Sequence, residues 1–193
     1  MRPRLSALVV ARNEEGRLAD CLFRLGFADE LVVVLDRCTD ESLAIANQFA
    51  DTVLEGAWPI EGDRRNAGLD ACTGDWILEV DADESVSKEL GLEIKEEIVK
   101  TECGYFLIPF LNYIGERCVR YGWGASWGVP AAPRLSYKGA KRWGRQRIHP
   151  ALELRGPKRW LSEPIKHEVD RDISDMIRRL DSYTAARAAD LRE

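Results

Sequence analysis

Three acidic residues follow a short apolar run near the middle of the chain. The run reads WILEV, and the acids Asp81, Asp83 and Glu84 come after it within four positions. Two carboxylates at a spacing of two, on a turn that leaves a strand, can share a divalent cation whose charge offsets their repulsion. Mg²⁺ completes such a shell with water and phosphate oxygens. The pattern predicts a metal site at Asp83 and Asp81, and a solvated acidic turn is the alternative interpretation.

Two other apolar runs also end in polar clusters. Residues 5–11 (LSALVVA) lead into RNEE, and residues 31–36 (LVVVLD) lead into RCTDES. In an open parallel sheet, ligands bind outside the carboxyl ends of the strands. We therefore expect the three polar clusters to face one crevice.

The elements that must position these clusters follow from the hydrophobic pattern of the first hundred or so residues. Apolar runs alternate with helix-period runs, which predicts an α/β fold with a parallel sheet covered by helices on both faces. Thr39 or Asp40 is the expected cap of the second helix, and Gly74 is expected to end the third. The expected strands are 5–11, 31–36, 51–56 and 75–81, and the expected helices are 14–26, 41–50, 62–74 and 87–101.

The second half of the chain has a different pattern. Strand-like pieces joined by Gly, Pro and Trp are expected at 105–115, 116–124, 133–139, 151–156 and 160–170, and a helix at 172–192. No repeat or low-complexity linker separates the halves. A chain of 193 residues suits one domain. We therefore expect a single domain over residues 1–193, with a nucleotide-binding half at 1–101 and a mixed half with a C-terminal helix at 102–193.

The composition limits the class of protein. Hydrophobic residues make up 45%, charged residues make up 32%, and the net charge is -5, as in ordinary globular proteins. No broad basic field favours nucleic acid. Residues 134–159 are rich in Arg and Lys, which indicates either a rim for an anionic ligand or membrane, or a solvated basic face. The five cysteines lack a CxxC pair and resemble reduced cytosolic thiols. Neither a signal peptide nor a membrane span is expected.

The ordered motifs SALVVARNEE, VVVLDRCTDES and DRRNAGLDACTGDWILEVDADE resemble family 2 glycosyltransferases of the GT-A fold. Members of that family carry Asn-Glu after the first strand, an acidic turn after the second, an Arg-Asn-x-Gly helix and a DxD. The later stretches RLSYKGAKRWGRQRIHP and HEVDRDISDMIRRLDSYTAARAADL are similar to the bacterial branch that includes lipopolysaccharide-core glucosyltransferases.

This resemblance implies an inverting transferase that uses Mg²⁺ or Mn²⁺ to move a sugar from a nucleotide-diphosphate donor. UDP is the implied nucleotide and glucose the implied sugar. The acceptor would be a glycan or a lipid-linked sugar in cell-envelope polysaccharide synthesis. The expected location is the cytoplasm, with peripheral contact at the cytoplasmic face of the inner membrane.

The resemblance also assigns residues to the donor. Ala11, Arg12 and Glu14 would flank the base and ribose. Asp36 would accept a hydrogen bond from the base, and its alternative interpretation is a turn acid before a helix. Arg65 would approach the diphosphate, because a guanidinium group matches phosphate oxygens, although neighbouring Arg64 could do the same.

Within the acidic motif, the resemblance gives the two aspartates different tasks. Asp83 would bind the metal directly, and Asp81 would contact the ribose or a metal-bound water. His167, in IKHEVD, matches a downstream family histidine that closes the metal shell or touches the diphosphate. A structural histidine on a strand is the alternative.

Inverting transfer needs a base that deprotonates the acceptor hydroxyl. His149 and Glu153 are the two candidates in the second half. At His149 the chain departs from its relatives, which commonly carry Glu at the next position, where this sequence has Pro150. Trp123 and Trp127, in YGWGASWG, would stack on a sugar or line the acceptor cleft, unless they pack in the core.

Two other functions are compatible with parts of the sequence. A nucleotide-sugar-binding protein without transfer activity would explain Pro150 and the short second half. A haloacid-dehalogenase-type phosphatase also places DxDxS after a buried strand, as in DADES. That motif normally lies on the first strand of such phosphatases, whereas here it follows the fourth expected strand. Steady release of phosphate from a phosphomonoester would favour the phosphatase.

Overall fold

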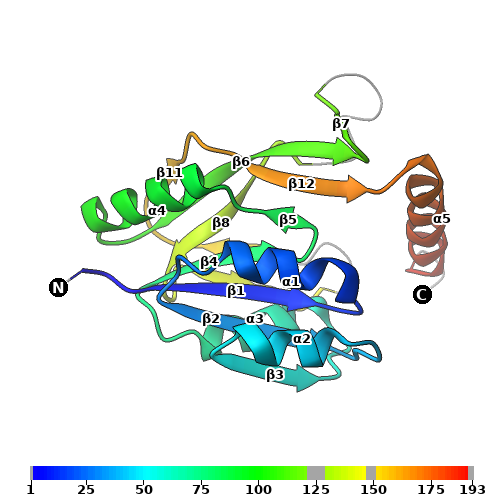
Figure 1. Cartoon of the computed structure of the whole chain (residues 1–193), viewed down its shortest axis with the longest axis horizontal. Coiled ribbons are helices and arrows are strands. Elements are labelled where there is room, and N and C mark those ends of the chain that lie inside the picture. Colours follow the sequence, from blue (N-terminus) through cyan, green and yellow to red (C-terminus); the bar gives the residue numbers. More distant parts are fainter. Residues whose placement is uncertain (1, 121–128, 147–150, 191–193) are drawn as a thin grey trace.

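The first four strands of the molecule form a parallel sheet. The computed structural model describes residues 2–120, 129–146 and 151–190. Strand β1 (Leu5–Ala11) lies between β2 (Glu30–Asp36) and β4 (Trp76–Asp81), and β3 (Thr52–Gly56) lies outside β2. All three pairings are parallel, so the expected parallel sheet is confirmed. The carboxyl ends of these strands, and the loops that follow them, lie at one edge (Figure 1).

The second half of the chain extends this sheet with mixed directions. Among the described residues the order is β3-β2-β1-β4-β8-β6-β12-β5, and β7 and β11 also pair with β6. Strand β8 runs antiparallel to both β4 and β6, while β12 runs parallel to β6. The added strands are β5 (Glu84–Ser85), β6 (Tyr105–Ile114), β7 (Arg117–Cys118), β8 (Ala131–Tyr137), β11 (Lys158–Trp160) and β12 (Ile165–Asp170). A separate antiparallel pair consists of β9 (Lys141–Trp143) and β10 (Leu152–Leu154).

Helices cover both faces of the sheet, as the alternating pattern predicted. Because side chains alternate along a strand, Leu5, Ala7 and Val9 pack in one core cluster and Leu8 packs in the other. The first cluster includes residues of α1 (Glu15–Arg24), α2 (Ser42–Phe49) and α4 (Lys88–Lys100), and the second includes Leu69 of α3 (Glu61–Ala71). Figure 1 shows α1 and α2 in front of the sheet and α3 behind it.

Two helix ends differ in detail from the sequence expectation. Asp40 does accept the backbone N–H of Ser42 at 3.1 Å, but Glu41 occupies the position before α2. Helix α3 ends at Ala71, before the glycine that was expected to stop it. A Cβ atom at Gly74 would lie 2.6 Å from the hydroxyl oxygen of Ser6. This glycine is therefore required for a close approach to β1 rather than as a helix stop.

The last helix, α5 (Ile173–Asp190), follows β12 and extends beyond the end of that strand (Figure 1). Its first turn places Met176 in the interior, while Ile173 and Ile177 are exposed. Within the part of the chain that the structure describes, no helix is both long and apolar enough to cross a membrane.

Candidate active site

The loops that leave β1 and β2 are joined by hydrogen bonds at the carboxyl edge of the sheet. The N–H of Glu14 donates to the Ser42 hydroxyl at 3.0 Å, and the N–H of Thr39 donates to Asn13 Oδ1 at 2.8 Å. Asn13 has a φ of 55° and Arg37 has a φ of 53°, a left-handed conformation that is uncommon outside glycine. Ala11 ends β1 in a buried position, and Arg12 is exposed beside it. The first two polar clusters are therefore in contact, and the third lies at the same edge because β4 runs parallel to β1.

Asp36, at the end of β2, is buried and fully hydrogen-bonded. Arg37 contacts it through Nε at 3.0 Å and Nη2 at 2.9 Å, and the N–H of Trp58 lies 3.1 Å from Oδ1. Arg64 Nη1 lies 3.1 Å from Oδ2. Burial raises the pKa of this carboxyl, but the hydrogen bonds lower it by more, so the pKa lies below its ordinary value. Asp36 thus holds Arg64 and Arg37 in place, and its contact with a base remains a prediction.

Asp81 ends β4 between two arginine side chains. Arg65 Nη1 lies 3.1 Å from Oδ1, and Arg134 Nη2 lies 2.5 Å from Oδ2. Burial opposes ionisation, yet Arg134 and Arg65 together hold the pKa of Asp81 well below its ordinary range. Of the two neighbouring arginines, Arg65 faces the acidic motif and Arg64 faces Asp36, and which of them approaches a diphosphate remains a prediction. Both carboxylate oxygens of Asp81 contact arginine side chains, and its expected role as a metal ligand remains a prediction.

Glu84 is the acid whose position the sequence did not predict. It is 2% exposed, accepts the backbone N–H of Asp81 at 3.0 Å, and contacts Arg134 through its other oxygen. Burial raises the pKa of Glu84 to about 7; Arg134 opposes this shift and Asp81 adds to it. Glu84 is therefore an integral part of the acidic motif.

Three side chains converge on a point beside this turn. One ligand atom each from Asp83, Glu84 and His167 lies within 4.8 Å of the other two. Strand β12 pairs antiparallel with β5 so that His167 stands opposite Glu84, and the N–H of Glu168 donates to the carbonyl of Asp83 at 2.9 Å. His167 Nε2 lies 3.6 Å from Asp83 Oδ2. Two carboxylates and one imidazole form a donor set that fits a small divalent cation. The expected ligands Asp83 and His167 are brought together, and Glu84 replaces Asp81 in the group.

A buried ion pair is linked to Arg65 through the side chain of Trp143. Lys141 of β9 contacts Glu79 of β4, and both side chains are 2% exposed. Burial lowers the pKa of Lys141, although Glu79 opposes this shift. Trp143 donates its indole N–H to Glu79 at 3.0 Å and lies 4.9 Å from the Arg65 guanidinium. Glu79 and Trp143 therefore support the Arg65 side chain that contacts Asp81.

A cavity of about 360 Å³ lies between the start of α1 and the junction of β12 and α5. Glu14, just before α1, and Arg17 of α1 line one side of it, and Asp170 and Arg171 line it from the junction. Burial raises the pKa of Glu14; Arg17 lowers it and Asp83 raises it further. Glu14 therefore faces the junction of β12 and α5, in the second half of the chain, across this cavity.

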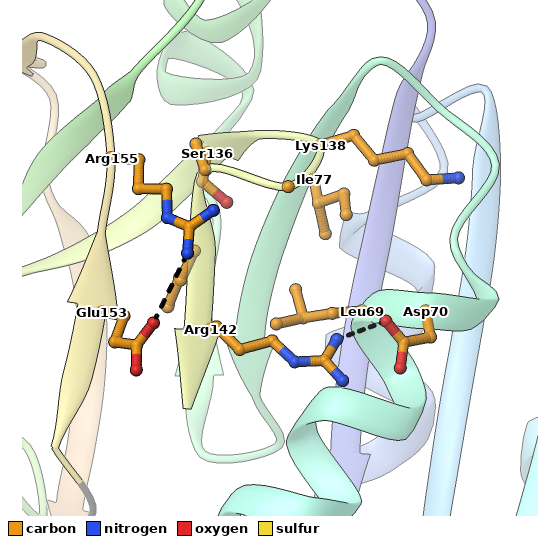
Figure 2. A pocket seen from close by; sticks show the side chains of 11 residues that line it. Leu69, Asp70, Ile77, Ser136, Lys138, Arg142, Glu153 and Arg155 are labelled. Atoms are coloured by element: carbon orange, nitrogen blue, oxygen red, sulfur yellow. Dashed lines mark hydrogen bonds and ion pairs between the residues drawn. The ribbon is translucent and has the colours of Figure 1, made fainter. Parts of the chain in front are cut away.

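Glu153, one of the two candidate bases, does not join the site. It lies on β10 opposite Arg142, and its side chain faces Arg155 at 3.8 Å (Figure 2). The cavity of about 390 Å³ that it lines also contains Ile77, near the start of β4, whereas the acidic motif follows the end of that strand. Glu153 lies there because the turn into β9 carries the chain back along α3, so that β10 lies toward the amino ends of the strands, and this placement gives no support to its expected role as a base.

Three other expected residues lie outside the described part of the chain. They are the acceptor candidates Trp123 and Trp127 and the base candidate His149.

Sequence reasoning missed three residues that the fold brings to the site. Glu84 was placed in the following turn, although it directly continues the acidic motif. Arg134 and Asn112 lie on β8 and β6, and each is a polar side chain within an apolar strand pattern. A polar side chain that interrupts an apolar strand was the sequence signal that could have identified Arg134 and Asn112 as site residues.

Comparison with known proteins shows what this chain resembles in sequence. Residues 6–148 match the protein family described as Glycosyl transferase family 2. An uncharacterized glycosyltransferase of Rickettsia felis is 36% identical over 93 residues, covering 48% of this chain and 33% of that protein. The lipopolysaccharide core biosynthesis glycosyltransferase LpsC of Rhizobium meliloti is 30% identical over 95 residues, covering 45% of this chain and 34% of that protein. The chain thus spans about a third of the length of these relatives.

Solved structures share the fold. Residues 1–349 of TarS from S. aureus, in complex with UDP, superpose with a TM-score of 0.65 at 18% identity, covering 86% of this chain and 60% of that chain. The complex of TarS with UDP-GlcNAc gives a TM-score of 0.63 at 18% identity, covering 86% of this chain and 58% of that chain. The mixed α/β architecture with its curled, mostly parallel sheet is the GT-A fold of these transferases.

Proposed function

The chain belongs to glycosyltransferase family 2, and from that premise we propose that it is a metal-dependent, inverting transferase that uses a UDP-sugar. The observation that carries the proposal is the convergence of Asp83, Glu84 and His167 beside the carboxyl ends of the strands. Parallel sheets bind nucleotides at this edge. The complexes of TarS with UDP and with UDP-GlcNAc support UDP as the nucleotide.

We assign the donor to the loops after β1, β2 and β4. Ala11, Arg12 and Glu14 lie along the first loop, and Asp36 lies at the base of the second. Arg65 faces the acidic motif and would contact the diphosphate through its guanidinium group. Asp81 would act through the arginines that it holds and through the ribose, rather than as a metal ligand.

Asp83, Glu84 and His167 would hold Mg²⁺ or Mn²⁺. A bound cation would offset the charge that develops on the leaving diphosphate. The chain itself orients this group: the pairing of β12 with β5 fixes His167 opposite Glu84, and Arg134 fixes Glu84. These contacts organise the ligands before the donor arrives, which reduces the reorganisation that catalysis requires.

The acceptor would enter through the cavity between α1 and the β12–α5 junction. Most of its lining residues are polar, with the carboxylate of Glu14 and the guanidinium of Arg17 on one wall, and this suits a hydroxyl-rich sugar. Glu14 lines this cavity and has a raised pKa, so we add it to His149 as a candidate base for the acceptor hydroxyl. LpsC, named for lipopolysaccharide core biosynthesis, supports a glycan or lipid-linked acceptor of the cell envelope.

A thermal-shift screen of UDP and UDP-sugars, with and without Mn²⁺, tests this function. A ligand at about 100 times its Kd adds about 2.7 kcal/mol to the free energy of unfolding, which corresponds to roughly 5–10 °C in Tm for a domain of this size. We expect Mn²⁺ to increase the UDP-dependent shift in the parent, and Asp83→Ala to lose that increase.

Asp70→Ala is the matched control, because Asp70 pairs with Arg142 near the C-terminal end of α3 and lines the cavity near the start of β4 rather than the acidic motif. It should respond like the parent. If no UDP compound stabilises the parent, or if Asp83→Ala responds as strongly, the proposed function is wrong. If a UDP-sugar does stabilise the parent, release of UDP from that sugar distinguishes a transferase from a protein that only binds the UDP-sugar.

A further inference from the structure

Both ring nitrogens of His167 face oxygen atoms. Nδ1 lies 2.9 Å from Oδ1 of Asn112, which stands opposite it in the parallel pairing of β6 and β12. Nε2 lies 3.6 Å from Oδ2 of Asp83. The ring also packs against Phe110, with 5.5 Å between the ring centroids. The imidazole is therefore held on two sides, and each nitrogen has a separate neighbour.

The side-chain amide of Asn112 is oriented by a second contact. Its Nδ2 donates to the backbone carbonyl of Val129 at 3.1 Å. A carbonyl oxygen only accepts hydrogen bonds, so the amide nitrogen must face Val129 and the amide oxygen must face the ring. That oxygen can accept only from a protonated nitrogen, so the hydrogen of a neutral ring belongs on Nδ1. The lone pair of the ring then lies on Nε2, on the side of Asp83.

We propose that Asn112 is a positioning residue that fixes His167 in the tautomer whose Nε2 can bind a divalent cation together with Asp83. A hydrogen bond to the second ring nitrogen is the usual way in which proteins orient a metal-binding histidine. Without Asn112, a neutral ring could carry its hydrogen on Nε2, and that hydrogen would block the cation. The inference rests on the proposed metal site and adds a residue outside the three ligands.

The tautomer can be measured directly, because the chain contains only two histidines. Two-bond ¹H–¹⁵N spectra distinguish a protonated ring nitrogen from an unprotonated one, and the His149→Gln variant assigns the signals of His167. At pH 8, where an imidazole is ordinarily neutral, we expect the Nδ1–H form in the parent. We expect loss of this preference in Asn112→Leu. An Nε2–H form in the parent would overturn the inference.

The second readout is the affinity for Mn²⁺, measured by electron paramagnetic resonance on the same proteins. Loss of such an orienting residue typically weakens metal binding by about 10–100-fold, and we expect a loss in this range for Asn112→Leu. Asn112→Asp keeps an acceptor for Nδ1–H and should retain the tautomer and bind Mn²⁺ within about threefold of the parent, by the same reasoning.

The outcomes separate this inference from the proposed function. Equal Mn²⁺ affinity in the parent and a folded Asn112→Leu variant would overturn the role of Asn112 and leave the metal site standing. An Asn112→Asp variant that keeps the Nδ1–H form but binds Mn²⁺ as weakly as Asn112→Leu would also overturn it, because the affinity would then not follow the tautomer. Failure of the parent to bind Mn²⁺ at all would overturn both.

Discussion

Arg134 contacts both Asp81 and Glu84 from a strand some fifty positions later in the sequence. Its side chain is 11% exposed, and its guanidinium lies 5.6 Å from the ring of Phe110, which in turn packs on His167. Asp81 is kept ionised by this arginine and by Arg65. At the scale of single residues, the negative charge of the acidic motif is therefore balanced by two arginines.

Replacing Arg134 tests this dependence. Arg134→Met removes one partner of a buried ion pair, which typically costs about 3–5 kcal/mol because the remaining charge is left without compensation. We expect a loss of this size in urea unfolding at pH 7, together with loss of the Mn²⁺-dependent part of the UDP shift.

Arg134→Lys is the matched control for charge. A lysine retains one positive charge, but its ammonium group cannot reproduce the planar fork that spans two carboxylates. It should fall between the parent and Arg134→Met in stability. Unfolding of Arg134→Met at the same urea concentration as the parent would show that Asp81 and Glu84 do not need this arginine.

At the scale of elements, α4 follows the acidic motif and must begin at a defined position. The hydroxyl of Ser87 accepts the N–H of Leu90 at 3.0 Å, which caps the helix. Leu90, Ile94 and Ile98 are buried along one side of the helix, and Gly91 allows Phe27 to pack closely. The cap therefore fixes the end of the turn that begins at Asp81.

Ser87→Ala removes this cap without changing the buried face of α4. We expect the free energy of unfolding to fall by about 1 kcal/mol, the usual cost of losing a serine cap, as measured by urea denaturation. Ser87→Asp keeps an oxygen acceptor at the same position and should cost less than half as much. Equal losses in the two variants would mean that the hydroxyl is important for a reason other than capping.

At the scale of the whole molecule, Glu30 joins three segments that are distant in sequence. The Ser6 hydroxyl of β1 donates to it, and Thr73, after α3, donates through its N–H at 2.8 Å and its hydroxyl at 2.8 Å. Burial raises the pKa of Glu30, but these hydrogen bonds lower it by more, so the pKa lies below its ordinary value of about 4.5.

A carboxyl whose pKa is lowered by folding stabilises the protein above its unfolded pKa and loses that effect as the pH falls through the folded value. We expect Glu30→Gln to lower the free energy of unfolding at pH 7 by about 2 kcal/mol, because hydrogen bonds to a charged group are lost. Urea unfolding from pH 7 to pH 3 should show the gap between parent and variant closing below about pH 4.5. A gap that stays constant over this range would contradict the role given to the ionised carboxylate.

The local sequence pattern determined the strands and helices of the first half of the chain, including those that carry the loops after β1, β2 and β4. Strands 5–11 and 75–81 and the helices between them were predictable, because alternation of side chains along strands and helical periodicity depend on neighbouring residues only. The expectation that polar clusters at the strand ends share one edge follows from parallel pairing, and the structure agrees. The candidate metal ligands Asp83 and His167 were found from the sequence through their resemblance to family motifs.

Only the tertiary structure decided which side chains meet at that edge. Insertion of β8 between β4 and β6 brings Arg134 to Asp81, and the pairing of β12 with β6 brings Asn112 to His167. Glu153 lies elsewhere because the β9–β10 pair turns back along α3. These contacts join residues far apart in the chain, and strand order is set by packing of the whole sheet. No local pattern of the sequence contains that information.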